Sequence, residues 1–299
     1  MQQLKIRIGT RESQLAKWQA QFVKSILQKN GHHAELVFIT SEGDIDLQTP
    51  LYAMGVQGVF TRSLDTALLN HKIDVAVHSM KDVPVQLPKG IIQAAVLERA
   101  SHKDIFVVGS NPNGAVATSS IRRKAQWLNK YPGTQIENLR GNVNTRLRKV
   151  VEGDWAGAIF AAAGLERIAV RPKHSYDLDW MVPAPAQGAI MVVAREEDKE
   201  IIDACSVSNH SATATAVKIE RDFLSALMGG CSMPISALAV VTDMNIEFKG
   251  NIALPDGSKK AETEIIFTMN QINEAGKLAA EELLRNGGKD ILDEMRKSF

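Results

Sequence analysis

The sequence predicts an α/β protein that ends in a smaller α+β domain. Strand and helix patterns alternate from the N-terminus, and the alternation starts again after Ser101. In the last third of the chain, three strand patterns follow one another without a helix between them. Alternation is typical of parallel sheets, whereas consecutive strands favour an antiparallel sheet. The length of 299 residues fits two or three domains.

The first part of the chain begins with a strand over Leu4–Gly9, where apolar and polar residues alternate. Ser13 is the expected N-cap of the next helix, which Asn30 and the following glycine end. Further strands are expected at residues 34–40, 73–78 and 91–96, with a helix at 61–69. The Gly-rich stretch from Gly43 to Gly58 predicts a long, mobile loop.

The second part predicts strands at residues 105–108, 135–139 and 158–162, with helices at 121–131 and 143–152. A Pro-rich connection over residues 181–188 leads into an apolar strand at 189–195. The last part predicts a helix at 210–227, strands at 235–241, 246–252 and 262–268, and a helix at 273–284 that can resume after Gly288.

The composition is that of an ordinary globular protein, with 44% hydrophobic and 23% charged residues and a net charge of +1. No apolar run approaches the roughly 18 residues that a membrane span needs, and the N-terminus lacks a signal core. Two cysteines make no disulfide framework, so we expect a cytoplasmic protein. The seven histidines show no metal-ligand spacing, and the chain has no dinucleotide or Walker motif. We therefore expect no membrane partner and no metal.

The positive charge is concentrated between Thr118 and Lys149, where eight basic residues face one acid, a local charge of +7. Arginine side chains bind planar oxyanions through paired hydrogen bonds. The stretch therefore predicts a polyanionic partner, which from charge alone is a phosphate, a nucleic acid or a carboxylate. Aromatic residues make up only 5% of the chain, and the neutral overall balance disfavours a nucleic-acid coat protein.

Lys81 and Asp82 follow the apolar strand at residues 73–78, at a sheet edge where ligands commonly bind. Asp82 could stabilise a cation or transfer a proton. An equally weighted alternative is that Asp82 caps a turn before Pro84 and that Lys81 pairs with a surface acid.

Residues Thr118–Ser120 precede a helix, and their hydroxyl and N–H groups predict an anion site. Simple N-capping explains the serines, but it does not explain Arg122 and Arg123, which oppose the helix dipole. Arg140 and the following glycine repeat this design before the next helix. Arg146 and Arg148 cannot share one helix face, so at most one of them faces a ligand.

Cys231 lies in a glycine-flanked loop, where something can approach the backbone closely. A lone cysteine is more often a small buried hydrophobe, and we expect this of Cys205. For Cys231 covalent attachment is a serious alternative. The glycines beside Gln187 and at Gly164 indicate only tight turns.

Taken together, these motifs resemble the porphobilinogen deaminase family. The strings that carry the resemblance occur in family order through residue 236: IGTRESQLAKWQA, TSEGD with TPL, DVAVHSMKDVPV, ATSSIRRKAQ, LRGNVNTRLRK, AAAGLERI, PAQGA and GGCSMPI. The last 60 or so residues match only in pattern.

The resemblance implies a transferase of tetrapyrrole and haem biosynthesis. Four porphobilinogens would lose ammonia and join head to tail into hydroxymethylbilane, on a dipyrromethane cofactor attached through the Cys231 thioether. It implies that Asp82 and Lys81 are the catalytic residues and that Asp82 stabilises the cation that ammonia loss creates. The implied cofactor-binding residues are Cys231, Lys81, Asp82, Ser119, Arg122, Arg123, Arg140 and Gln187. The implied substrate-binding residues are Arg11, Ser13, Arg146, Gly164 and Arg167.

The same resemblance implies three domains and a monomer. Two domains would resemble the lobes of type II periplasmic binding proteins: residues 1–98 with 187–206, and residues 99–186. The third, residues 207–299, would be the α+β domain that presents Cys231. Two positions depart from the family: Gln57 replaces a common lysine in the Gly-rich loop, and Ser236 replaces a glycine and is expected to tilt the cysteine loop slightly.

Two other functions compete with this one. A non-catalytic, two-lobed protein that binds a carboxylate ligand between its domains would need no covalent cofactor. A nucleic-acid-binding protein would use the basic stretch, but Trp127 and Tyr131 predict no stacking platform. We therefore expect porphobilinogen as the partner, without nucleic acid.

Overall fold

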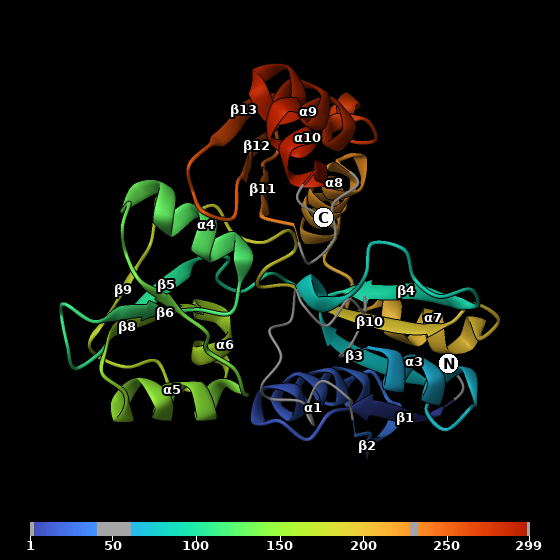
Figure 1. The fold of residues 1–299 in the computed structure, drawn as a ribbon. Coiled ribbons are helices and arrows are strands. Elements are labelled where there is room, and N and C mark those ends of the chain that lie inside the picture. Colours follow the sequence, from blue (N-terminus) through green and yellow to red (C-terminus); the bar gives the residue numbers. More distant parts are fainter. Residues whose placement is uncertain (1–2, 41–60, 228–232, 298–299) are drawn as a thin grey trace.

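The computed structural model describes residues 3–40, 61–227 and 233–297. The Gly-rich loop with Gln57 and the loop with Cys231 lie outside the described residues. Three sheets organise the described chain, and Figure 1 shows each of them with its own helices.

The first sheet joins the N-terminal strands to one strand from far along the chain. Its order is β2-β1-β3-β10-β4, with β1 (Lys5–Thr10), β2 (His33–Phe38), β3 (Val75–Ser79), β4 (Ile91–Val96) and β10 (Ile190–Arg195). β1 is parallel to β2 and β3, whereas β10 is antiparallel to both of its neighbours. The returning strand at 189–195 is thus confirmed, and it makes the sheet mixed rather than purely parallel.

Helices α1 (Gln14–Lys29), α3 (Arg62–Leu69) and α7 (Lys199–Ser206) belong to this first lobe. Ser13 is the N-cap of α1 as expected, because its side chain accepts a hydrogen bond from the Ala16 N–H. The short helix α7 was not predicted from the sequence. Cys205 lies on it and is buried, as expected.

The second sheet repeats the design of the first. Its order is β7-β6-β8-β5-β9, with β5 (Asp104–Val108), β6 (Ala115–Ala117), β7 (Ile136–Glu137), β8 (Trp155–Ala161) and β9 (Ser175–Asp177). β6 is parallel to β7 and β8, and β5 is the antiparallel strand in the fourth position. Its helices are α4 (Ile121–Lys130), α5 (Val143–Glu152) and α6 (Ala162–Arg167).

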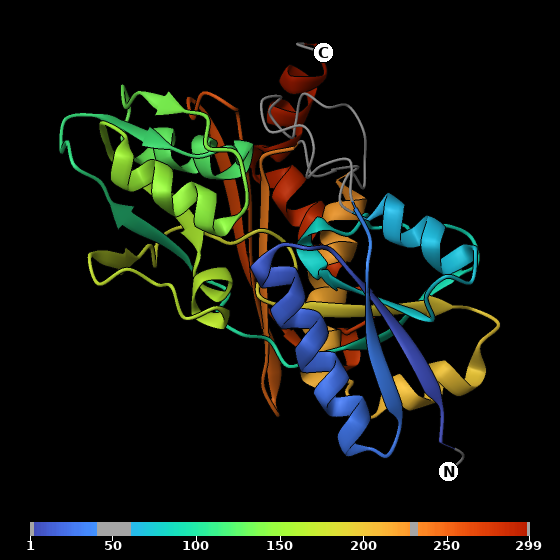
Figure 2. The same ribbon diagram turned by 90° about the horizontal axis from the view of Figure 1, so that it is seen from below.

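The chain crosses between the two sheets twice, after β4 and again after β9, and each crossing delivers the antiparallel strand of the next sheet. This exchange gives the two-lobed α/β arrangement that was expected, seen from two directions in Figures 1 and 2. The fold class predicted from the sequence is confirmed. The domain boundaries at residues 98, 186 and 206 remain predictions.

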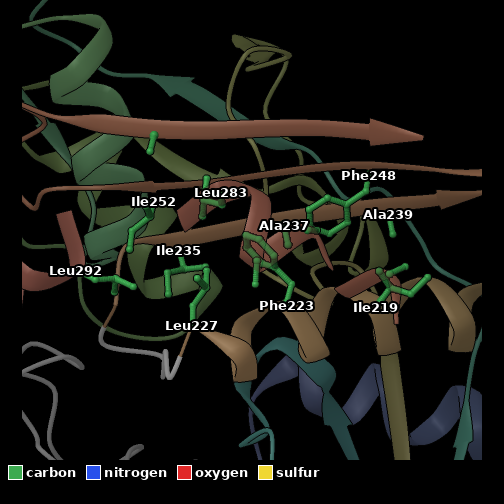
Figure 3. Packing of buried hydrophobic residues seen from close by; sticks show 14 of the residues in the cluster. Ile219, Phe223, Leu227, Ile235, Ala237, Ala239, Phe248, Ile252, Leu283 and Leu292 are labelled. Atoms are coloured by element: carbon green, nitrogen blue, oxygen red, sulfur yellow. The ribbon is translucent and has the colours of Figure 1, made fainter. Parts of the chain in front are cut away.

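The third sheet is an antiparallel meander of β11 (Ile235–Val241), β12 (Asn245–Ala253) and β13 (Lys260–Thr268). Helices α8 (Ser211–Ala226), α9 (Ala275–Leu283) and α10 (Lys289–Lys297) complete this unit. Figure 3 shows its core, where the rings of Phe223 and Phe248 lie 5.0 Å apart. Gly287, with a φ of +96°, separates α9 from α10 where a resumption of the helix was expected.

The third unit contacts the second lobe through Gln126 of α4. The Gln126 amide donates to the hydroxyl of Ser236 at 2.9 Å, and its oxygen accepts from Asn251 at 3.2 Å. Ser236 is fully buried, so the serine at this position makes a contact that a glycine cannot make. Within the described ranges, none of the helices is long and apolar enough to cross a membrane.

Candidate active site

A cleft of about 570 Å³ lies where the two lobes and the third unit meet. It is lined by the loop after β1, the turn after β3, the N-terminal ends of α4 and α5, helix α6 and part of α8. Among the described lining residues, one is acidic, Asp82, and eight are basic: Arg11, Lys81, Arg122, Arg123, Arg140, Arg146, Arg167 and Arg221. The cleft therefore attracts a polyanion while presenting one carboxylate to it.

Lys81 and Asp82 form one turn of 3-10 helix, η2 (Met80–Asp82), directly after β3. Within the described part of the chain, no hydrogen bond or ion pair engages the Asp82 carboxylate, so capping does not account for it. The Lys81 ammonium donates to Gln187 Oε1 at 3.2 Å instead of pairing with a surface acid. Burial lowers the pKa of Lys81 to about 8, and the positive charge of Arg123 adds to the effect.

Arg122 and Arg123 share a buried partner, Asp104, at the start of β5. Its two carboxylate oxygens accept from Arg122 Nη2 at 2.7 Å and from Arg123 Nη2 at 2.8 Å. Burial alone would raise the pKa of Asp104, but the charges of Arg122, Arg123 and Lys81 outweigh it and lower the pKa to about 2. Asp104 was not predicted from the sequence, because this residue lies outside the basic stretch. Its only local indication is the position of an acidic residue directly before an apolar strand.

Each of these two guanidinium groups also donates to a backbone carbonyl: Arg122 to Val182 at 2.7 Å and Arg123 to Ile159 at 2.9 Å. Asp104 and the carbonyls of Val182 and Ile159 thus fix the orientation of both arginine side chains at the N-terminus of α4. Because the groups are held in place, they can meet an anionic ligand with little loss of side-chain entropy.

Ser119 joins the two basic loops of the cleft. Its hydroxyl accepts from the Leu139 N–H at 3.0 Å and lies 2.6 Å from Asn138 Oδ1 and 2.5 Å from the Leu139 carbonyl. A hydroxyl has a single proton, so it donates to one of these two oxygens at a time. Ser120, rather than Ser119, caps α4 by accepting from the Arg123 N–H at 3.4 Å.

Arg146 reaches the cleft from α5, which Asn142 caps by accepting from the Thr145 N–H at 3.0 Å. The Nε atom of Arg146 is buried without a hydrogen-bond partner in the described structure. Burial, together with the charges of Arg123 and Arg140, lowers the pKa of Arg146 to about 10. A buried cation among other cations is suited to bind an anion.

The remaining basic residues of the stretch lie outside the cleft. Arg148 is exposed and lies 3.8 Å from Glu152, one helical turn along α5. Lys149 donates to the Arg140 carbonyl at 3.3 Å. Lys130 lies over the ring of Trp180, 5.1 Å from its centroid.

The loop between β1 and α1 of the first lobe contributes Arg11 and Ser13 to the lining. Helix α6 of the second lobe contributes Gly164 and Arg167. Gly164 lies within α6 and not in the tight turn that was predicted, and a side chain there would meet Leu15 at an ordinary 3.6 Å, so space alone does not require a glycine. Arg167 donates to the Gly188 carbonyl at 2.6 Å and lies over the ring of Trp18 at 5.8 Å. Burial lowers the pKa of Arg167 to about 10.

Gln187 is fully buried and contacts several residues of the site. Besides accepting from Lys81, its amide donates to Asp104 Oδ1 at 3.0 Å and to the His102 carbonyl at 2.8 Å. From the sequence its neighbouring glycine indicated only a tight turn, which Gly188 makes with a φ of +88°. The structure thus connects Lys81 to the Asp104 cluster through one side chain.

The two cysteines differ in what can be said of them. Cys205 is 1% exposed, and burial raises the pKa of its thiol to about 12. Such a thiol is a poor nucleophile at neutral pH. Cys231, the predicted attachment point, lies outside the described residues, although Met233 and Ile235 just after it line the cleft.

The described cleft fits a pyrrole ligand that carries several carboxylates. Its cations match carboxylate groups, the buried Nε of Arg146 lacks a partner, and Asp82 presents an acceptor for pyrrole N–H groups. Among the described residues, no group of three or more His, Cys, Asp or Glu side chains is placed to hold a metal ion.

Comparison with known proteins gives two family-model matches. Residues 6–203 match "Porphobilinogen deaminase, dipyromethane cofactor binding domain", and residues 214–285 match "Porphobilinogen deaminase, C-terminal domain". The chain is 37% identical to the porphobilinogen deaminase of a Nitratiruptor species, covering 97% of this chain and 96% of the relative. It is 39% identical to that of Desulfitobacterium hafniense, covering 97% of both.

Among solved structures, the methionine-binding protein MetQ aligns with a TM-score of 0.44 and 14% identity, over 68% of this chain and 89% of that one. The L-cystine solute receptor of Neisseria gonorrhoeae aligns with a TM-score of 0.39 and 12% identity, over 71% of this chain and 88% of that one.

Proposed function

Since this chain belongs to the porphobilinogen deaminase family, we propose that it joins four porphobilinogen molecules head to tail into hydroxymethylbilane, releasing ammonia. The observation that carries the proposal is the cleft itself, where, among the residues that the structure describes, eight basic side chains and one carboxylate form the lining. Each porphobilinogen carries an acetate and a propionate for the cations to bind. We propose that the carboxylate stabilises a cation that forms during the reaction.

The cofactor is a dipyrromethane, which when bound supplies the pyrrole carbon that receives the first substrate. We propose that the Cys231 thiol attaches it, because the Cys205 thiol is buried with a raised pKa. On the side of the cleft formed by α4 and the turns around it, the proposed binding residues are Lys81, Asp82, Ser119, Arg122, Arg123, Arg140 and Gln187.

The proposed substrate-binding residues are Arg11, Ser13, Arg146, Gly164 and Arg167, which line the same cleft. Ser13 caps α1 and Arg167 is fixed by the Gly188 carbonyl, so both would meet the substrate in preset positions. The buried Nε of Arg146 would find in a substrate carboxylate the acceptor that the described protein does not supply.

Asp82 is the proposed catalytic residue. When the C–N bond within the protonated aminomethyl group of porphobilinogen breaks, ammonia leaves with the bonding electrons and the positive charge spreads over the pyrrole ring. A fixed carboxylate next to the pyrrole N–H stabilises that charge as it develops, without waiting for water to reorient. Lys81, held by Gln187, is the proposed partner that keeps a carboxylate of the ligand beside Asp82.

The family models favour this enzyme over a non-catalytic carboxylate-binding protein, because both are models of deaminase domains. Arg122 and Arg123 of α4 line the cleft and are buried rather than spread over an exposed surface, which disfavours nucleic acid as the partner. A monomer in the cytoplasm remains our proposal.

The proposal is tested by intact-mass measurement and product analysis of the purified protein. We expect added mass of two pyrrole rings, and conversion of porphobilinogen to hydroxymethylbilane with one ammonia released per substrate. In Asp82→Asn the added mass should remain while turnover falls on the order of 100-fold or more. A wild-type chain without the added mass before and after incubation with porphobilinogen would refute the proposed function. Normal turnover by Asp82→Asn would remove Asp82 from the mechanism.

A further inference from the structure

We infer that Arg221, on helix α8 of the third unit, is a positioning residue that fixes the turn carrying Asp82. The inference rests on the proposed function, in which Asp82 acts on the substrate. Arg221 is 9% exposed, and its guanidinium donates to three successive carbonyls: Val83 at 2.9 Å, Pro84 at 2.6 Å and Val85 at 3.1 Å. These are the three residues directly after Asp82.

The segment that Arg221 holds has little regular structure of its own. Residues 83–90 contain neither helix nor strand, so the three carbonyls that Arg221 binds belong to no strand ladder. A guanidinium is planar and presents its donors in fixed directions, so three bonds to one turn define the conformation of that turn. The contact joins residues 136 to 138 positions apart, which makes the Asp82 turn depend on the third unit.

The preceding residue of α8, Glu220, holds the other side of the same site. Its fully buried carboxylate accepts from the Ala186 N–H at 2.6 Å, the Ala239 N–H at 2.8 Å and Arg99 Nη1 at 2.6 Å. Ala186 precedes Gln187, which accepts from Lys81. Two adjacent residues of α8 therefore hold two segments of the site. Arg221 holds the residues that follow Asp82, and Glu220 holds the residue before Gln187, which contacts Lys81.

The same helix precedes the proposed attachment point in the sequence. Helix α8 ends at Ala226, five residues before Cys231 in the chain. Arg221 thus acts on the reaction through Asp82, because three of its hydrogen bonds go to the turn that follows this residue.

The test compares Arg221→Lys with the matched control Arg195→Lys. Arg195 is also buried, and it donates to the Leu68 and Ile73 carbonyls at 2.7 and 2.6 Å, but it lies outside the cleft lining. In both variants lysine keeps the positive charge but lacks the planar guanidinium group with its several N–H donors. We expect both to lose thermal stability and both to keep the cofactor mass. In Arg221→Lys alone, kcat should fall 10- to 100-fold with KM within about 2-fold, because small displacements of a reacting group are costly.

Equal kcat in Arg221→Lys and wild type, or an equal kcat loss in Arg195→Lys, would overturn the inference. If Arg221→Lys does not fold, Arg221→Gln, which keeps an N–H donor on a neutral side chain, takes its place with the same expected outcomes. Wild-type protein and Asp82→Asn are assayed alongside. If wild type forms no product or Asp82→Asn turns over normally, the proposed function fails, rather than the contact between Arg221 and the turn.

Discussion

Asp104 shows how a single buried carboxylate organises a cationic site. Two adjacent arginines at the start of a helix repel each other and the helix dipole. Asp104 binds both, and Gln187 donates to the same carboxylate, so one residue fixes three lining side chains. The cluster still carries excess positive charge towards the cleft, which is what a carboxylate ligand requires.

Replacing Asp104 by asparagine should destabilise the protein at pH 7 by about 3–5 kcal/mol, because two buried guanidinium groups lose their counter-charge. Asp104 is fully buried, and its pKa of about 2 lies below the value of about 3.9 expected in the unfolded chain. The stabilisation is therefore fully present above about pH 4 and is lost as the pH falls towards 2. Urea unfolding of wild type and Asp104→Asn across this range measures it.

The difference in unfolding free energy between these two proteins should narrow between about pH 4 and pH 2. Asp179→Asn, an exposed acid 2.7 Å from Lys103, is the control and should change stability by less than about 1 kcal/mol. A difference for Asp104→Asn that stays constant down to pH 2 would contradict the assignment of this carboxylate as ionised.

The two cysteines allow a matched test of the attachment point. Cys231→Ser should lack the thioether-bound dipyrromethane, because serine supplies no thiolate to form the bond. Cys205→Ser should keep it, since the buried Cys205 thiol has a pKa raised to about 12. Intact mass of both purified variants gives the answer directly. A full cofactor mass on Cys231→Ser, or its loss from a folded Cys205→Ser, would reverse the assignment.

At the scale of the elements, local patterns predicted the capped helices and the long strands well. The sequence predicted α5 at its observed bounds, Val143–Glu152, and in the structure Asn142 caps this helix and Gly153 follows it. It missed α6 and β9, which have six and three residues and leave no room for a period to show. The pairing of β10 with β3 and β4, by contrast, is a long-range choice that no local pattern contains.

The residues of the candidate site also differ in whether the sequence could predict them. Motifs brought Lys81, Asp82 and the arginines to attention, since polar residues after apolar strands are visible locally. The partners that fix them were not visible, because Asp104 and Arg221 act across 18 and 138 residues. Contacts over such separations follow from tertiary packing and have no local signal.

The two crossings between the lobes touch each other at Gly188. Its φ is +88°, and a Cβ there would lie 2.6 Å from the Ser101 carbonyl oxygen and 2.8 Å from that of Ala100. Gly188→Ala should therefore cost well over 1 kcal/mol, from backbone strain together with a clash between main chains. Chemical denaturation measures the loss of stability.

Gly133→Ala is the matched control for this prediction. Gly133 has a similar φ of +83°, but nothing lies within 4 Å of the position where its Cβ would be. Its substitution should cost only the backbone term of about 1 kcal/mol. Equal losses in the two variants would show that the close approach of the crossings is not a constraint.

At the scale of the whole molecule, the charge of the cleft can be compared with that of the growing chain. Eight lining cations set against Asp82 and the buried Asp104 leave an excess of six positive charges among the described residues. A dipyrromethane brings four carboxylates and each added ring brings two more. The cofactor and one substrate unit therefore match the excess, and every later ring adds negative charge that this part of the cleft does not compensate.

Salt should consequently affect early and late additions in opposite directions. Screening weakens the attraction between the cleft and the first substrate, and it also weakens the repulsion that later substrates meet. Raising the salt concentration from about 0.05 to 0.5 M should slow formation of the first intermediate several-fold and speed the third and fourth additions. Intact-mass analysis of rapidly quenched samples resolves each intermediate by the mass of its added rings. Arg148→Gln changes the net charge outside the cleft and should leave this pattern as it is. The same fractional response to salt in all four steps would mean that the charge balance of the cleft does not govern chain growth.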